Sequence, residues 1–338
     1  MTSIKDAISK LIDKKDLTEQ ETTDIFTQIM GGSATDAQIA SFLTALRLKG
    51  ETIDEITGAA KVMRQKATTI APKVEALVDT CGTGGDSTGT FNISTTAAFI
   101  VAGAGIPVAK HGNKSVSSKS GSADVLEALG VNLEVTPKTV TECIEKANIG
   151  FLFAPRFHAA MKYAIGPRKE MGIRTIFNII GPLTNPANAK AQLIGVYDPN
   201  LTEPLAHALS NLGTTRAYIV HGYPLDEIST TGPTKITELK DSQISTYTVS
   251  PEEFNIKPTD ISQIAGGTPE QNSRITLDIL HNKKGPKYDI AILNAAAAIA
   301  AGAKAETIKD AIPLAEESIE SKKALEALEK LKEITNAN

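Results

Sequence analysis

The sequence predicts an α/β protein built from a small all-helical N-terminal domain and a larger α/β domain with a mostly parallel central sheet. Residues 1–70 carry only helical patterns, whereas short β-type runs alternate with helical patterns from about residue 75 onward. Such alternation is typical of a parallel sheet covered by helices. The length of 338 residues also favours two domains over one.

The first 70 residues contain three sequence signatures of helix starts. Each is a capping box, in which a Thr is followed three residues later by Glu or Gln: Thr18 with Glu21, Thr35 with Gln38, and Thr52 with Glu55. Glycines at 31–32 and 50 supply matching helix ends. Apolar residues recur at helical spacing, so each helix is expected to bury one stripe. We therefore expect residues 1–70 to form a helical domain.

The remainder of the chain reads as alternating strands and helices. Strands are expected at 76–79, 106–109, 150–153, 193–197 and 217–220, and helices at 94–104, 123–129, 139–147 and 203–212. Thr-Pro pairs at 136–137 and 268–269 predict two further helix starts. The proline-containing segment 165–188 interrupts the alternation, and we expect it to pack back on the helical domain. Residues 71–164 and 189–338 would then form the α/β domain.

Composition excludes several classes of protein. The chain has 35 Lys and Arg against 39 Asp and Glu, a net charge of −4, which argues against general nucleic-acid or anionic-membrane binding. Its two cysteines, Cys81 and Cys143, lie in no metal-binding pattern and fit a reducing cytoplasm. The longest apolar stretch, 291–303, is too short to span a bilayer. We expect a cytoplasmic protein without nucleic-acid or membrane partners.

A glycine-rich segment at 79–96 follows a predicted strand and precedes a predicted helix. Its glycines and hydroxyl residues would let the backbone approach a phosphate, with the helix dipole near Ser94 favouring negative charge. The spacing matches neither a dinucleotide-binding motif nor a P-loop. The alternative is a plain connecting loop. Cys81 is interpreted as a small filler, since no low-pKa environment can be argued for a nucleophile.

A second loop, residues 110–122, combines three lysines with five serines. Lys110, Lys114 and Lys119 make it basic and rich in donors, which suits a polyphosphate. His111 is a candidate general base or an ordinary hydrogen-bonding histidine. Ser122 is a binding candidate or simply the N-cap of the next helix.

Two further features complete the set. The adjacent carboxylates Asp226 and Glu227 follow a predicted strand and could bind Mg²⁺, although an exposed acidic pair is the alternative. Arg168 lies in the interrupting segment, where its guanidinium could bind a carboxylate. Arg174 is the competing candidate for that role, and a surface arginine is the other interpretation.

Taken in order along the chain, these segments resemble the anthranilate phosphoribosyltransferase family. The resemblance is carried by residues 79–95, Lys110-His-Gly-Asn113, the run 120–130, Arg168, the run 178–186 and Asp226-Glu227. It implies a fold of the nucleoside phosphorylase/phosphoribosyltransferase type, a homodimer, and the transfer of a phosphoribosyl group from phosphoribosyl pyrophosphate (PRPP) to anthranilate in tryptophan biosynthesis. One departure is Lys114-Ser115, where many relatives have Arg-Ala.

The resemblance also implies roles for individual positions. It assigns PRPP to Gly82, Gly85, Asp86, Thr90, Asn92, Ile93, Ser94, Thr95, Lys110, His111, Gly112, Asn113, Lys114, Ser115, Val116, Ser117, Ser118 and Ser122. It assigns anthranilate to Gly82, Asn113 and Arg168, and Mg²⁺, two per monomer, to Ser94, Asp226 and Glu227. Lys110 and His111 are the candidates for stabilising the leaving group and the transition state.

Two other functions compete with this interpretation. Pyrimidine nucleoside phosphorylases share the fold and a similar run near residues 120–127, but they are considerably longer and lack the Lys-His-Gly-Asn and Asp-Glu motifs in this arrangement. A relative that has lost catalysis and binds nucleic acid would show a basic surface and eroded loops. This acidic chain with intact motifs fits neither.

Overall fold

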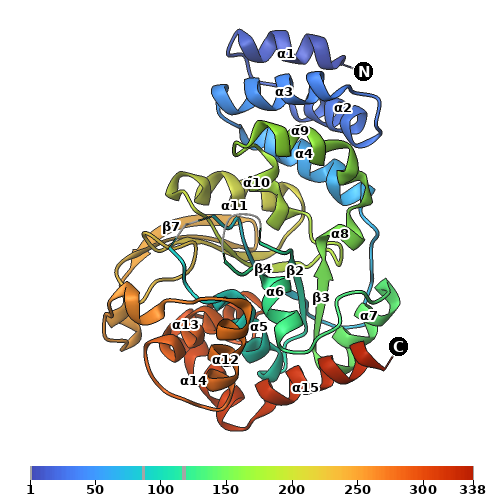
Figure 1. The fold of residues 1–338 in the computed structure, drawn as a ribbon. Helices are drawn as coiled ribbons and strands as arrows, with labels where there is room; N and C mark the ends of the chain where they lie inside the picture. Colours follow the sequence, from blue (N-terminus) through green and yellow to red (C-terminus); the bar gives the residue numbers. More distant parts are fainter. Residues whose placement is uncertain (1, 86–87, 116–118, 338) are drawn as a thin grey trace.

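The computed structural model describes residues 2–85, 88–115 and 119–337. A helical bundle forms one end of the molecule and a sheet covered by helices forms the other (Figure 1). This arrangement confirms the predicted fold class. No helix in these ranges is long and apolar enough to cross a membrane.

The bundle begins with four helices: α1 (Ile4–Ile12), α2 (Glu19–Met30), α3 (Asp36–Lys49) and α4 (Ile53–Lys66). All three predicted capping boxes are present at the starts of α2, α3 and α4. The helices α9 (Lys162–Met171) and α10 (Phe177–Ile180) join them, because α9 contacts α2 and α3 while α10 contacts α4. A segment distant in sequence therefore completes the bundle.

Within the described part of the chain, seven strands form one sheet in the order β3-β2-β1-β4-β5-β6-β7. The first five are parallel: β1 (Val78–Gly82), β2 (Val108–Gly112), β3 (Ile149–Phe153), β4 (Ala191–Gly195) and β5 (Arg216–His221). The first residue of each of these strands lies within two residues of the first residue of a predicted strand.

The last two strands, β6 (Thr234–Lys240) and β7 (Gln243–Val249), form an antiparallel hairpin that the sequence analysis missed. Its turn residues Asp241 and Ser242 both have positive φ, which suits a tight hairpin. The signal was present as a run of β-branched residues and Tyr247. It was weak because β7 is mostly exposed and shows no clean apolar alternation.

Helices cover the sheet. The α/β part contains α5 (Ile93–Gly103), α6 (Ser122–Ala128), α7 (Pro137–Ala147), α8 (Ala154–Phe157), α11 (Thr202–Asn211), α12 (Pro269–Leu280), α13 (Pro286–Ala301), α14 (Ile308–Glu320) and α15 (Lys323–Asn336). The apolar stretch at 291–303 falls mainly in α13, which is buried between α5, α14 and the sheet. Its alanines allow this close packing, since they add little side-chain bulk. Thr136 and Thr268 cap their helices with proline at the first position, as predicted.

The apolar core continues from the sheet into the bundle. Ile194 and Val196 from the β4 region and Ile219 of β5 belong to the same buried cluster as the inward faces of α2, α3 and α4. Leu205 and Leu209 of α11 complete the connection, and α11 contacts α4 directly. Burial of this shared surface fixes the bundle against the sheet.

Two buried histidines lie with their rings close together. His111 of β2 is 8% exposed and His158, which follows α8, is 6% exposed, and their ring centroids lie 5.1 Å apart. Burial, together with the neighbouring His158, lowers the pKa of His111 to about 3. Burial lowers the pKa of His158 to about 4. Both rings are therefore neutral in the folded protein near neutral pH.

This pair predicts a loss of stability in acid. Histidines in the unfolded chain have a pKa of about 6.5, so below that pH the unfolded state binds protons that the folded state excludes. The free energy of unfolding should fall as the pH decreases from about 6.5 to about 4, by up to about 1.4 kcal/mol per histidine per pH unit. Urea unfolding at pH values between about 7 and about 5 measures this slope.

The matched variants isolate the two rings. His111→Gln with His158→Gln should flatten the pH dependence, whereas His207→Gln, at an exposed site on α11, should leave it unchanged. An unchanged slope in the double variant would contradict the assignment of the acid sensitivity to this pair.

Candidate active site

The candidate site lies at the carboxyl ends of the parallel strands. Because β1, β2, β4 and β5 run parallel, the loops that follow them meet at one edge of the sheet. These loops carry the glycine-rich segment, the lysine- and serine-rich segment, and the Asp226-Glu227 pair. The structure therefore brings together three of the four sequence-predicted features.

The N-terminus of α5 is open toward this edge. Asn92 is its N-cap residue but makes no capping hydrogen bond from its side chain. The hydroxyl oxygen of Thr95, in the first turn, is buried and has no hydrogen-bond partner among the described residues. Free N–H groups and the helix dipole at such a terminus favour an anion. An unsatisfied hydroxyl at the same place adds a further donor for one.

Lys110 supplies positive charge at this point. It is 2% exposed, and its Nζ lies 3.3 Å from the hydroxyl oxygen of Ser94 and donates to the carbonyl oxygen of Thr80. Burial lowers the pKa of Lys110, and nearby Asp79 opposes that effect. An anion beside Ser94 would compensate the desolvation of this ammonium group.

The neighbouring thiol is not activated. Burial raises the pKa of Cys81 well above its usual value, and the negative charge of nearby Asp79 raises it further. Burial also raises the pKa of Asp79, while a hydrogen bond from Asn185 opposes that shift. A thiol that stays protonated is a poor nucleophile, in agreement with the interpretation of Cys81 as a filler.

Asp226 reaches across to the glycine-rich loop. Its Oδ2 accepts a hydrogen bond of 3.0 Å from the N–H of Gly84, and both Asp226 and Glu227 are half-buried. A Cβ on Gly82 would lie 3.0 Å from the same Oδ2. A Cβ on Gly195 would lie 1.5 Å from the carbonyl oxygen of Asp226. Glycine at both positions is therefore what allows the acidic pair to approach the loop.

Asn294 fixes the backbone that follows the acidic pair. It interrupts the apolar surface of α13 and is fully buried. Its Oδ1 accepts from the N–H of Ile228 and its Nδ2 donates to the carbonyl of Ile228, each at 2.9 Å. In the sequence, this asparagine lies within the apolar stretch 291–303 and gave no sign of this role.

The second loop is held at two points by Asp124 of α6. Its Oδ2 accepts from the N–H of Ser115 at 3.0 Å and from the N–H of Gly121 at 2.8 Å. The N-cap of α6 is Gly121 and not Ser122, whose hydroxyl instead donates to the carbonyl of Asn113. Sequence reasoning missed Asp124, although an acidic residue three positions after Gly121 is a capping signal.

Some predicted residues stand apart or fall outside the description. Lys114 forms an ion pair of 2.9 Å with Glu127 on α6 and is exposed. Four residues that the sequence analysis assigned to PRPP lie outside the described residues: Asp86, Val116, Ser117 and Ser118.

The two candidate arginines differ in their surroundings. Arg174 stacks 4.0 Å above the ring of Tyr197 and donates to the carbonyl of Gly85, so it is engaged with the glycine-rich loop. Arg168 lies 4.9 Å above the ring of Phe177, and it has no ion pair with the described residues. Burial lowers the pKa of Arg168. Arg168 is thus the arginine with donors to spare for a carboxylate.

The donor set suits a substrate-bound Mg²⁺. No cluster of three or more His, Cys, Asp or Glu side chains able to hold a metal occurs within the described ranges. Mg²⁺ is commonly held by one or two carboxylates together with substrate phosphates and waters. Asp226, Glu227 and the hydroxyl of Ser94, at the same sheet edge as the anion-binding terminus, fit that pattern.

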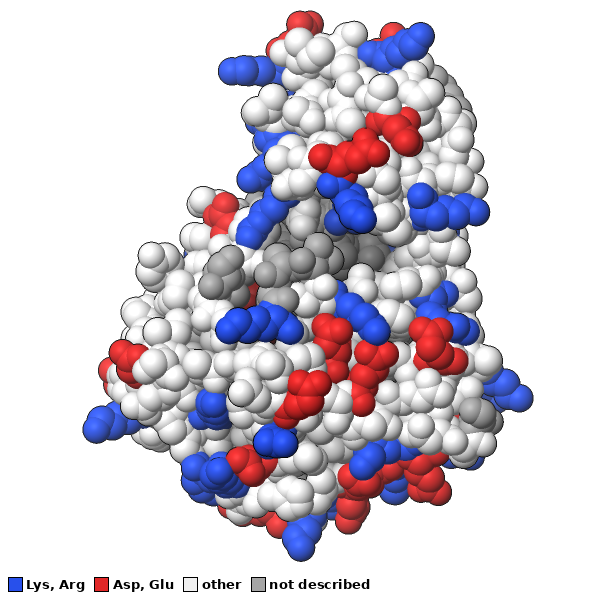
Figure 2. Space-filling model, in the orientation of Figure 1, with Lys and Arg blue, Asp and Glu red and all other residues white. Residues whose placement is uncertain are grey.

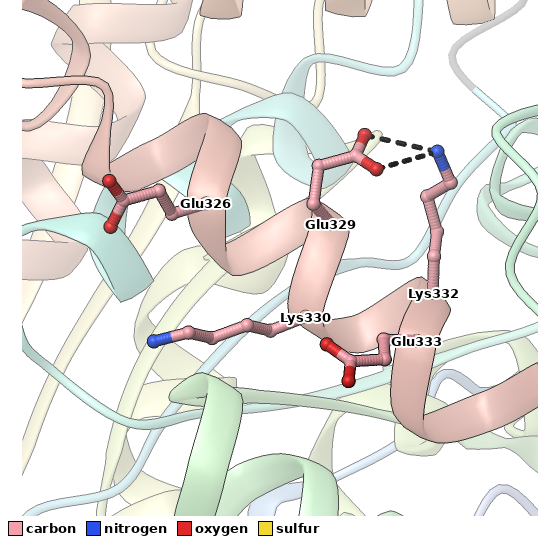
Figure 3. Close-up of a pocket in the computed structure, with 5 residues that line it drawn as sticks. All are labelled: Glu326, Glu329, Lys330, Lys332 and Glu333. Carbon is pink, nitrogen blue, oxygen red and sulfur yellow. Dashed lines mark hydrogen bonds and ion pairs between the residues drawn. The ribbon is translucent and has the colours of Figure 1, made fainter. Parts of the chain in front are cut away.

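Surface shape agrees with this location. Figure 2 shows a hollow at the waist of the molecule, between the bundle above and the sheet below, with Lys and Arg side chains on both sides. A second, shallow depression lies on α15 and is lined by Glu326, Glu329, Lys330, Lys332 and Glu333 (Figure 3). These side chains all come from one helix and their ends diverge, and Glu329 pairs with Lys332 at 3.0 Å. It is a solvated helix face and not a binding site.

Comparison with known proteins identifies relatives for both parts of the chain. Residues 5–67 match the glycosyl transferase family, helical bundle domain, and residues 74–325 match the glycosyl transferase family, a/b domain. An anthranilate phosphoribosyltransferase of Acetivibrio thermocellus is 56% identical over 335 residues, covering 99% of this chain and 97% of that protein.

Solved structures give the same result. The crystal structure of anthranilate phosphoribosyltransferase from Thermus thermophilus superposes with a TM-score of 0.93 at 40% identity, covering 98% of this chain and 99% of the other. The structure of anthranilate phosphoribosyltransferase from Saccharomyces cerevisiae in complex with PRPP and Mg superposes with a TM-score of 0.90 at 29% identity. The match covers 99% of this chain and 98% of the other. Full-length similarity in sequence and in structure shows that this chain belongs to the anthranilate phosphoribosyltransferase family.

Proposed function

We propose that this chain transfers the 5-phosphoribosyl group of PRPP to the amine of anthranilate, giving N-(5-phosphoribosyl)anthranilate and pyrophosphate in tryptophan biosynthesis. The observation that carries the proposal is the meeting of an open helix terminus, Lys110 and the Asp226 carboxylate at one sheet edge. These groups suit a polyphosphate and the metal that accompanies it. The names of the curated relatives and of the solved structures support the same reaction.

We assign the donor site to the first two loops. The residues proposed to contact PRPP are Gly82, Gly85, Asp86, Thr90, Asn92, Ile93, Ser94, Thr95, Lys110, His111, Gly112, Asn113, Lys114, Ser115, Val116, Ser117, Ser118 and Ser122. The open first turn of α5 and the buried ammonium of Lys110 support the pyrophosphate position. Mg²⁺, two per monomer, is assigned to Ser94, Asp226 and Glu227. When bound, it neutralises charge on the pyrophosphate.

The proposed reaction depends on charge stabilisation and positioning. Lys110 stabilises the departing pyrophosphate, which favours cleavage at ribose C1 through an oxocarbenium-like state. The anthranilate amine attacks from the opposite face, so the configuration at C1 inverts. An aniline-type amine is already neutral near pH 7, so the attack requires no strong general base, and the nitrogen releases one proton to water after the C–N bond has formed. His111, whose pKa burial lowers to about 3, suits contact with substrate better than proton removal.

Anthranilate is assigned to Gly82, Asn113 and Arg168. Arg168 comes from the bundle, whereas Gly82 and Asn113 follow strands of the sheet. A guanidinium can hold a carboxylate through two parallel hydrogen bonds, which would orient the amine toward ribose C1. The acceptor would then bind between the two parts of the molecule.

We further propose a cytoplasmic homodimer. An apolar groove between α1 and α3 includes Ile12, which is 69% exposed, and Leu48, which is 81% exposed. Large apolar side chains exposed together on one face are typical of an interface, and a second copy of the chain would bury them. Both cysteines are unpaired, in keeping with a reducing compartment.

The reaction itself is tested by anthranilate fluorescence. Mixing the protein with anthranilate, PRPP and Mg²⁺ should cause a progressive loss of anthranilate emission as the amine is substituted. The chain contains no tryptophan, so its own emission interferes little. A folded protein that leaves the emission constant would overturn the proposal. Phosphorolysis of thymidine or uridine with inorganic phosphate should be absent.

Removing the proposed carboxylate ligand should affect one substrate selectively. Arg168→Ala should raise the KM for anthranilate by about tenfold to a hundredfold, because a charge-assisted hydrogen-bond pair is lost. The KM for PRPP should change by less than about threefold. Lys169→Ala, at the neighbouring exposed position on α9, is the matched control and should alter neither value. Equal effects of Arg168→Ala on both substrates would contradict the assigned role.

The acidic pair should control the dependence on metal. The double variant Asp226→Asn with Glu227→Gln removes both carboxylates without changing side-chain size, and should shift the Mg²⁺ titration of turnover by about tenfold or more. Glu317→Gln, at an exposed site on α14, should leave that titration unchanged. A wild-type titration curve in the double variant would remove this pair from the metal site.

A further inference from the structure

We propose that Asn272 of α12 is a positioning residue that keeps the side chain of Asn92 from capping α5, so that the N–H groups of Ser94 and Thr95 stay open to the pyrophosphate of the donor. The inference rests on the proposed function, because it assigns the open terminus to PRPP. It concerns a residue outside the three predicted loops. Its effect on substrate would pass through Asn92.

Asn92 differs from the Ser and Thr residues that form the N-caps of α-helices in the described ranges. Seven of these use their side chains to accept from the N–H three positions ahead, with ψ between 149° and 166°: Ser3, Thr18, Thr35, Thr52, Thr136, Thr268 and Thr307. Asn92 has ψ 74° and makes no such bond. Asparagine is among the strongest N-cap residues, so something must hold it in this other conformation.

The side chain of Asn92 is occupied elsewhere. Its Oδ1 accepts from the Nδ2 of Asn272 at 2.9 Å and from the hydroxyl of Ser120 at 3.3 Å. Its Nδ2 donates to the carbonyl of Ser120 at 3.1 Å. The oxygen that would cap α5 is therefore directed to α12 and to the second loop.

Asn272 is itself held in one orientation. It is 1% exposed, and its Oδ1 accepts from the backbone N–H of Gly267 at 2.8 Å. A backbone N–H can only donate, so the Nδ2 of Asn272 must face Asn92. Asn92 must then present its oxygen to Asn272 and its nitrogen to the carbonyl of Ser120. The fixed donor at Gly267 thus sets the orientation of two amides in succession.

The two helices are also joined one turn further along. The hydroxyls of Thr96 on α5 and Thr276 on α12 lie 2.9 Å apart, and both residues are fully buried. The segment before α12 pairs with the glycine-rich loop, since Gly266 donates to the carbonyl of Gly89 and Phe91 donates to that of Ile264. Because the segment before α12 is paired with this loop, Asn272 has a rigid position from which to hold Asn92.

Without the contact between Asn272 and Asn92, the side chain of Asn92 should compete with PRPP for the N–H groups at the start of α5. Without Asn272, the Oδ1 of Asn92 could turn to the N–H groups of Ser94 or Thr95, the ordinary N-cap arrangement. Those donors would then be partly satisfied before PRPP binds. The connection from Asn92 to Ser120 would weaken as well, because the same side chain makes both contacts. Binding of PRPP should suffer more than binding of anthranilate.

The test compares variants on the same face of α12. Asn272→Ala should raise the KM for PRPP by about tenfold, the scale of an N-cap interaction, with less than about a twofold change in the KM for anthranilate. Thr276→Val is the matched control: it removes a buried hydroxyl pair between the same helices, one turn away, and should leave both KM values unchanged. Circular dichroism and thermal unfolding check that each variant folds.

A double variant separates positioning from a general loss of structure. If Asn272 acts through Asn92, its removal should have no further effect once that side chain is gone. Asn92→Ala with Asn272→Ala should therefore have the same KM for PRPP as Asn92→Ala alone. Additive effects would overturn the inference, as would an equal rise for both substrates or an effect reproduced by Thr276→Val.

A misfolded variant, a failed proposed function and a failed positioning role can be told apart. If Asn272→Ala does not fold, Asn272→Ser replaces it, because a hydroxyl can still accept from Gly267 but is too short to reach Asn92. If the wild-type protein shows no turnover of anthranilate, the proposed function fails. An active wild type with unchanged kinetics in the Asn272 variants would contradict only the positioning role.

Discussion

The arrangement of the site depends on one open helix terminus. The first turn of α5 points its donors toward the sheet edge, and Asn92 does not cap them. An uncapped terminus costs free energy unless a ligand or water satisfies it. The surrounding groups also favour an anion. The Thr95 hydroxyl is unpaired among the described residues, and Lys110 is buried with its ammonium beside Ser94. All of these groups would be stabilised by one anion at one place.

The shared apolar core fixes the bundle against the sheet. One buried cluster runs from β4 and β5 into the bundle and includes Ala164 of α9, the helix that carries Arg168. Arg174 adds a polar connection, since it spans from the segment after this helix to the carbonyl of Gly85 while stacking on Tyr197. Apolar and polar contacts therefore both join the bundle to the sheet and its loops.

The sequence predicted the parts of this arrangement that rest on local signals. Capping boxes, the strand–helix alternation and the three loops all depend on residues close together in the chain, and the structure contains them. The hairpin β6–β7 was not predicted because its exposed strand β7 shows no alternation of apolar and polar residues. Asn272 and Asn294 escaped because a single buried amide gives no sign of its partner, which here lies 180 or 66 residues away.

Charged and neutral polar residues occupy different places in the candidate site, and the reason is physical. Groups proposed to meet the substrates carry charge, as Lys110, Asp226 and Arg168 do, and charge is costly to bury without a partner. Groups that hold the loops from behind, Asn272 and Asn294, are neutral amides in fully buried positions. An amide has both donors and an acceptor, so it can satisfy an N–H and a carbonyl at once, as Asn294 does with Ile228. A carboxylate in the same position could not donate. It would leave the carbonyl of Ile228 unsatisfied, beside the acidic pair whose place that backbone sets.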